Sequence, residues 1–72
     1  MIYTDGVHLI TDGDLSELHE FAQRIGLKRE WFQNKNIKHP HYDIWGEIKE
    51  RALENGAEVV SSKEIVRILR RR

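Results

Sequence analysis

The chain has 72 residues, of which 39% are hydrophobic and 33% are charged, and its 12 basic residues balance its 12 acidic residues. This length predicts a single domain, residues 1–72, with a small core, because a domain of about 60 residues buries only about 60% of its unfolded surface. Zero net charge argues against a general nucleic-acid-coating protein, and the lack of cysteine excludes disulfides and thiolate zinc sites. No apolar run reaches the roughly 18 residues of a membrane span and no signal peptide is recognised, so we expect a cytoplasmic protein without a membrane partner.

The first segment holds two β-favouring runs, residues 2–4 and 7–10, on either side of Asp5-Gly6. Asp-Gly is typical of a two-residue hairpin turn of type I′, in which both central residues have positive φ. A hairpin is therefore predicted. The alternative is a single strand, residues 2–4, that leads into a loop.

Three helices are predicted from apolar periodicity. The first follows residues 11–14, which offer several N-caps, and ends at Gly26. The second spans residues 44–55, with Trp45 on its apolar face, and ends at Gly56. The third spans residues 62–69 and begins with a capping box, Ser61 to Glu64.

The connecting segments predict further strands. Residues 57–60 are interpreted as a strand with Ala57 and Val59 turned inward, with Val60 left open. Residues 28–30 are interpreted as a helical turn and residues 31–33 as a short strand. The order β(β)-α-(β)-α-β-α predicts an α/β fold, a small single-layer sheet of two to four strands with three helices. In such folds strand C-termini and helix N-termini share one edge, which is the usual ligand site. We expect residues 11–14 and 39–43 to meet at this rim.

Residues 39–43, His-Pro-His-Tyr-Asp, concentrate groups that bind ligands or move protons. In an extended segment His39, His41 and Asp43 point to the same side. Imidazoles and a carboxylate suit zinc, iron or manganese, so the sequence suggests a divalent metal site of His8, His41 and Asp43, with Asp12 added from the other rim segment. The alternative is that Asp43 caps the second helix, His41 packs its ring and His39 is exposed.

Other uses of the same residues remain open. The helix N-terminus after Asp43 favours a phosphate, with His41 and Tyr42 as donors, and a histidine–carboxylate pair suits general acid–base chemistry. Among the aromatic residues, Trp31 and Tyr42 are expected nearest the rim and the others in the core. The arginines at residues 70–72 permit nucleic-acid binding, although the helix dipole explains them as well.

Several segments occur in an order that is fairly specific. They are His8-Leu9-Ile10-Thr11-Asp12, Glu17-Leu18-His19-Glu20-Phe21-Ala22, Ile25-Gly26, Trp31, His41-Tyr42-Asp43-Ile44, Arg51-Ala52 and Gly56-Ala57. This succession resembles a family of short bacterial and phage proteins known as a domain of unknown function, number 4031. The resemblance implies no reaction, but it points to His8, Asp12, His41, Tyr42 and Asp43 and to a bacterial cell or a phage-infected host.

Two functions are carried forward. The first is a small binding or catalytic domain for a metal ion or a phosphate-bearing ligand. Its candidate residues are His8, Asp12, Trp31, His41, Tyr42 and Asp43. The second is an accessory protein that acts by protein–protein interaction without catalysis, or as a homodimer that buries Leu53, Trp45 or Ile37. Nucleic-acid binding through the terminal arginines is the weaker third.

Overall fold

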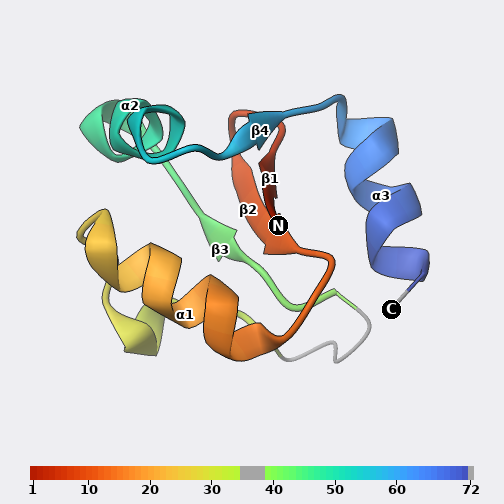
Figure 1. Cartoon of the computed structure of the whole chain (residues 1–72), viewed down its shortest axis with the longest axis horizontal. Helices are drawn as coiled ribbons and strands as arrows, with labels where there is room; N and C mark the ends of the chain where they lie inside the picture. The colour runs from red at the N-terminus through yellow and green to blue at the C-terminus, as the bar shows by residue number, and fades with distance from the viewer. Residues whose placement is uncertain (35–38, 72) are drawn as a thin grey trace.

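The computed structural model describes residues 1–34 and 39–71 (Figure 1). Its strands are β1 (Ile2–Thr4), β2 (His8–Thr11), β3 (Tyr42–Asp43) and β4 (Glu58–Val59). Its helices are α1 (Leu15–Arg24), α2 (Gly46–Glu54) and α3 (Ser62–Arg70), with a short 3-10 helix, η1 (Arg29–Trp31). The predicted α/β class and the order of the elements are confirmed.

The four strands form one mixed sheet in the order β3-β2-β1-β4. Strand β2 is antiparallel to both of its neighbours, β1 and β3, whereas β1 and β4 are parallel. Strands β1, β3 and β4 therefore run in one direction and β2 runs in the other. This reversal decides which residues reach the candidate site.

Helices cover both faces of the sheet. Because side chains alternate along a strand, neighbouring residues Leu9 and Ile10 face opposite sides. Leu9 packs in a cluster with residues of α1 and α2, whereas Ile10 packs with residues of α3. Figure 1 shows the same division, with α1 and α2 on one side of the strands and α3 on the other. Two small cores thus share one sheet, and both Leu9 and Ile10 are 0% exposed.

The predicted hairpin is confirmed, but its turn is not of type I′. Strand β1 ends at Thr4 and β2 begins at His8, so residues 5–7 form the connection. No residue other than glycine has a positive φ in the described chain. Gly6 alone in this turn adopts that conformation, with φ of 95°. The Asp5 carboxylate fastens the turn, because its Oδ1 accepts hydrogen bonds from the backbone N–H groups of Val7 (3.0 Å) and His8 (2.8 Å).

The first and third helices begin as predicted. Asp14 caps α1 by accepting a hydrogen bond from the Ser16 backbone N–H at 2.9 Å, and Ser61 caps α3 by accepting one from Glu64 at 3.1 Å. Helix α2 differs, since its N-cap is Trp45, which makes no side-chain capping bond. The N-cap interpretation of Asp43 is therefore wrong; Asp43 belongs to β3.

Three further expectations are corrected. Val59 is 63% exposed and does not point inward, because β4 is a two-residue strand at the sheet edge. Ala57, which directly precedes β4, is buried as expected. Trp45 is 52% exposed and not part of the core, because it precedes α2 and adopts an extended conformation. Trp31 ends η1 instead of forming a strand, while Gln33 makes a single bridge to His41.

Candidate metal centre

The candidate site lies at the edge where β1, β3 and β4 end and β2 begins. Asp5 follows β1, Asp43 ends β3, and Ser62 follows β4 as the first residue of α3, while His8 opens β2. Helices α2 and α3 both start near this edge. The topology therefore brings four polar residues from distant parts of the sequence to one place.

His8, His41 and Asp43 are brought together by strand pairing. His8 lies directly opposite Asp43 in the β2–β3 register, and His41 precedes Asp43 by two residues. One ligand atom from each residue lies within 4.8 Å of the others. His41 Nε2 is 3.4 Å from Asp43 Oδ1, and the two imidazole rings meet edge-on with centroids 5.4 Å apart.

Each of these three side chains is oriented by a further hydrogen bond. His8 Nδ1 donates to Asp5 Oδ2 at 3.0 Å, and His41 Nδ1 donates to the His39 carbonyl oxygen at 2.8 Å. Both bonds favour the tautomer that keeps a lone pair on Nε2, which is the form that binds metal ions. Gln33 Nε2 donates to Asp43 Oδ2, so the other carboxylate oxygen is the one beside His41.

From the sequence, Asp5 was expected only in the hairpin turn. In the structure its side chain also forms hydrogen bonds with His8 of β2 and Ser62 of α3 at this edge. Its side chain is 3% exposed, and its Oδ2 also accepts a hydrogen bond from the Ser62 hydroxyl at 2.9 Å. Burial by itself would raise the pKa of the Asp5 carboxyl, but the bonds from His8, Val7 and Ser62 outweigh burial and hold that pKa far below its ordinary value. Asp5 is therefore a carboxylate at neutral pH, suited to hold an imidazole.

An open groove of about 860 Å³ adjoins the cluster. It is lined by Glu30, Trp31, Phe32, Gln33, Asn34, His39, His41, Asp43 and Trp45. Side chains of two candidate ligands, His41 and Asp43, are 23% and 47% exposed. A ligand in the groove can thus approach both of them, and Trp31, predicted near the rim, lines the same groove.

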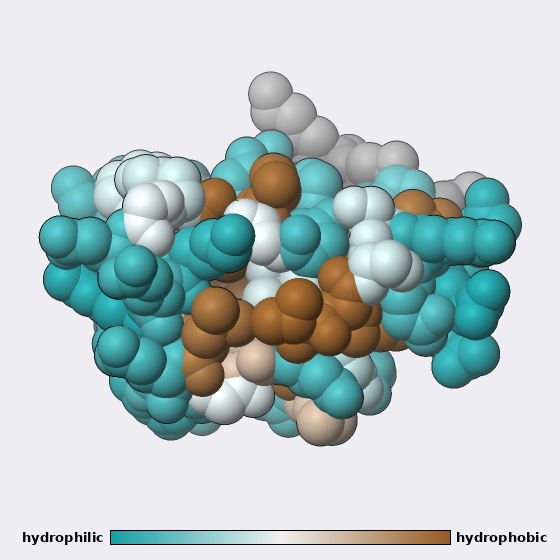
Figure 2. Space-filling model, turned by 90° about the horizontal axis from the view of Figure 1, so that it is seen from above, coloured by the Kyte–Doolittle hydropathy of each residue, from teal (hydrophilic) through white to brown (hydrophobic). Residues whose placement is uncertain are grey.

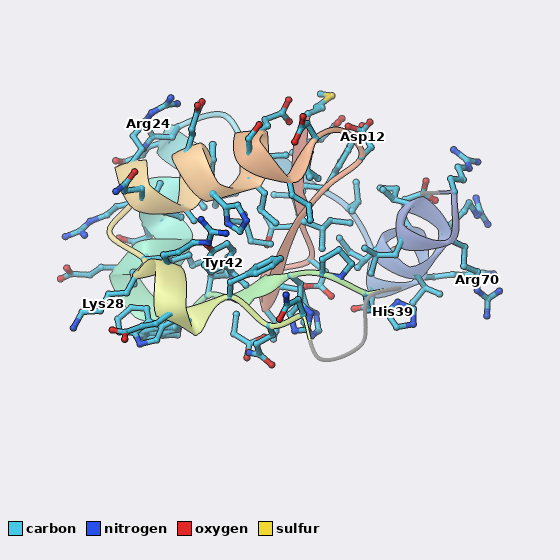
Figure 3. All side chains as sticks on the ribbon, turned by 90° about the horizontal axis from the view of Figure 1, so that it is seen from below. Asp12, Arg24, Lys28, His39, Tyr42 and Arg70 are labelled. Atoms are coloured by element: carbon cyan, nitrogen blue, oxygen red, sulfur yellow. The ribbon has the colours of Figure 1, made fainter. Side chains whose placement is uncertain are left out.

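Asp12 and Tyr42 are placed elsewhere. Asp12 follows the end of β2 and so lies at the opposite edge, where its carboxylate bonds to the amino group of Met1 and to the hydroxyl of Tyr3. Tyr42 is 1% exposed, in the core and not at the rim. Figure 3 shows Tyr42 inside the molecule and Asp12 at its periphery. The expected rim of residues 11–14 and 39–43 is not formed.

His19, which was not among the candidate site residues, packs against this core. Its Nδ1 lies 2.8 Å from the Tyr42 hydroxyl, and its ring meets Phe32 edge-on at a centroid distance of 4.5 Å. Burial, and to a smaller extent the charge of Arg29, lower the pKa of His19 below its ordinary 6.5. A neutral His19 Nδ1 accepts the hydrogen bond from Tyr42.

This arrangement predicts a pH effect on stability. The unfolded chain takes up a proton on His19 before the folded chain does, so the free energy of unfolding should fall as pH drops below about 6.5 and level off below the folded pKa. Urea unfolding of the protein and of His19→Gln across this range measures the effect. The difference between the two should change with pH, because His19→Gln removes the group whose pKa is lowered by folding. Parallel curves would contradict the role given to His19.

The model of a family described as a protein of unknown function (DUF4031) matches residues 4–72. The chain belongs to this family. The resemblance proposed from the sequence is confirmed, while the bacterial or phage origin stays a prediction. No curated protein and no solved structure matches the chain. Membership of DUF4031 supplies no reaction, so the function is argued from the site.

Two remaining expectations concern surfaces. In the described part of the chain no helix is long and apolar enough to cross a bilayer. A band of hydrophobic surface crosses the face in Figure 2. Leu53, expected in a dimer interface, is 41% exposed, whereas Ile37 lies outside the described residues. The homodimer stays a prediction.

Proposed function

We propose that this domain binds a divalent transition metal ion, Zn²⁺, Mn²⁺ or Fe²⁺, through His8, His41 and Asp43. The observation that supports this most directly is the convergence of their three ligand atoms within 4.8 Å of one another. Two residues come from one segment and the third from a segment more than 30 positions earlier.

The donor set suits these ions. Two imidazole nitrogens and one carboxylate oxygen match the three protein ligands of catalytic zinc sites and of non-haem iron sites, both of which leave coordination positions open. Bonds of about 2.1 Å in tetrahedral geometry place neighbouring ligand atoms about 3.4 Å apart. The His41–Asp43 separation already has this value, 3.4 Å.

The hydrogen bonds behind the ligands support the same function. Metal-binding histidines generally donate their second ring N–H to a carboxylate or a carbonyl, which fixes the tautomer and the ring orientation. His8 has such a carboxylate in Asp5 and His41 has such a carbonyl in His39. The two bonds, together with the convergence of the three ligand atoms, favour a metal site over an accidental cluster.

Zinc titration followed by the imidazole NMR signals tests the proposal. We expect the signals of His8 and His41 to shift at stoichiometric zinc, and those of His19 and His39 to stay in place. His41→Ala should abolish the shift of His8. His39→Ala is the matched control, because it removes a nearby imidazole but keeps the backbone carbonyl that holds His41. Unchanged His8 and His41 signals throughout the titration would refute the metal site.

A further inference from the structure

We infer that a second pocket, separate from the metal ligands, binds the oxyanion group of a small ligand, a carboxylate or a phosphate. The pocket has a volume of about 760 Å³, within the roughly 300–1,000 Å³ of small-ligand sites. His19 and Gln23 line it from α1, and Lys28 and Arg29 line it from the start of η1. The three proposed metal ligands do not line this pocket, so the inference is independent of the metal site.

The fold brings the lining side chains together from two elements. His19 and Gln23 are four residues apart in α1 and therefore share one face of the helix. Gly26, with a φ of 96°, follows the end of this helix, and the Leu27 backbone N–H donates to the Ala22 carbonyl oxygen at 2.9 Å. This closing bond reverses the chain. The two basic residues that come next therefore lie beside α1.

His19 presents a hydrogen-bond donor to the pocket. Its Nδ1 accepts from the Tyr42 hydroxyl at 2.8 Å, so the proton of the neutral ring is on Nε2. Nε2 forms no hydrogen bond with the described residues, and among these residues no buried side-chain nitrogen or oxygen lacks a partner. Nε2–H therefore reaches solvent, and the bond to Tyr42 and the edge-on contact with Phe32 fix the direction of the ring.

Arg29 and Lys28 give the pocket its positive charge. Burial lowers the pKa of His19 and the charge of Arg29 lowers it further, so the guanidinium lies near the imidazole ring. Within residues 1–34 and 39–71 the guanidinium makes no hydrogen bond or ion pair, so its N–H groups stay available. Glu30 also lines the pocket and offsets part of the charge. A guanidinium beside an imidazole N–H suits a carboxylate or a phosphate, which accepts hydrogen bonds from both.

NMR titration of the metal-free protein at neutral pH, with sodium phosphate and separately with sodium succinate, tests the inference. We expect the signals of the His19 imidazole and the Arg29 Nε–H to shift with one common dissociation constant. The signals of His8 and His39 should stay in place. Sodium chloride at the same ionic strength should cause neither shift. The anion with the lower dissociation constant identifies the bound group as phosphate or carboxylate.

Substitutions of exposed side chains separate the pocket from general charge attraction. Arg29→Gln should weaken anion binding by about 10- to 150-fold, because a charge-assisted hydrogen bond is lost. Arg67→Gln is the matched control, since it makes the same change in net charge on α3, on the other side of the sheet, and should leave the affinity unchanged. Lys28→Gln should weaken binding less than Arg29→Gln. Glu30→Gln should strengthen it by about 1.5- to 5-fold, because a repulsive charge is removed.

Two results would overturn the inference. One is a His19 signal that stays in place with both anions, whatever zinc does to the signals of His8 and His41. The other is an equal loss of affinity in Arg29→Gln and Arg67→Gln, which would show that net charge alone attracts the anion. The two proposals fail separately, because unchanged His8 and His41 signals in zinc refute the metal site and leave the oxyanion pocket standing.

Discussion

Substituting Asp5 with asparagine is expected to weaken zinc binding by about 10- to 100-fold, although Asp5 is not one of the three proposed ligands. The Asp5 carboxylate holds His8 through its Nδ1 and thereby selects the tautomer with a lone pair on Nε2. An asparagine side chain has one acceptor oxygen where aspartate has two. If its amide NH2 takes the place of Oδ2, it cannot accept the hydrogen bond from His8 Nδ1–H. The imidazole would lose its orientation and part of its basicity.

The same substitution should also destabilise the fold. Asp5 Oδ1 accepts two backbone hydrogen bonds in the turn, and Oδ2 accepts one from Ser62 in addition to that from His8. Leaving buried groups of this network without partners costs about 1–3 kcal/mol in the free energy of unfolding. Because one buried side chain joins β1, β2 and α3, the loss concerns the whole edge of the sheet.

Calorimetric zinc titration and urea unfolding of Asp5→Asn measure the two effects separately. Ser62→Ala is the matched variant, since it removes one bond to Asp5 and leaves the bond to His8. It should lower stability modestly and retain most of the zinc affinity. Asp12→Asn controls for loss of a carboxylate at the opposite edge and should leave zinc affinity unchanged. Equal zinc affinity in Asp5→Asn and the parent protein would contradict the role of Asp5.

The sequence was sufficient to predict most of the fold and to name the three side chains that the structure brings within 4.8 Å of one another. Apolar periodicity and the glycines at residues 26 and 56 located the helices, because such patterns reflect local backbone preferences. His41 and Asp43 were grouped correctly because extended residues two apart share a side. His8 lies near them because β2 pairs with β3 in a register that puts His8 opposite Asp43. From the sequence, the two segments were expected to meet at the rim, but this register was not predicted.

Asp12 lies away from the expected rim because of the direction of β2. A common rim of strand C-termini and helix N-termini requires parallel strands, but the hairpin, which was also predicted, reverses β2. The C-terminal end of β2, and Asp12 after it, therefore lies at the other edge, beside the amino group of Met1. Applied consistently, the hairpin prediction would have excluded Asp12 and favoured Asp5, which precedes His8 by three residues.

The contact of Gln33 with Asp43 and the exposure of Trp45 could not be predicted from the sequence. Gln33 reaches Asp43 because a single backbone bridge to His41 aligns the two segments, with N–H···O distances of 2.9 and 3.1 Å. Such isolated pairs have no periodicity of their own. Trp45 matched the apolar face of α2, and its exposure follows from where the helix begins, one residue later. Helix boundaries depend on tertiary contacts that local patterns do not contain.

Replacing Leu9 with alanine is expected to cost about 2–5 kcal/mol of the free energy of unfolding. Leu9 is 0% exposed and sits in the cluster shared by α1 and α2, while its backbone pairs with Thr4 and Tyr42. A domain this small has a total stability near the lower end of about 5–15 kcal/mol, so Leu9→Ala should be largely or partly unfolded. Val59→Ala is the control, because Val59 is 63% exposed, and it should change stability by less than about 0.5 kcal/mol.

The same variant links the core to the proposed metal site. Zinc at 100 times its dissociation constant stabilises a folded protein by about 2.7 kcal/mol, provided that the unfolded chain does not bind it. His8 lies on β2, Asp43 lies on β3 and His41 directly precedes β3, and Leu9 joins these strands to the core. Zinc should therefore restore much of the circular dichroism and raise the melting temperature of Leu9→Ala. The double variant Leu9→Ala/His41→Ala should remain unfolded in zinc. Equal recovery of the single and double variants would show that zinc acts elsewhere, since only the former keeps all three ligands.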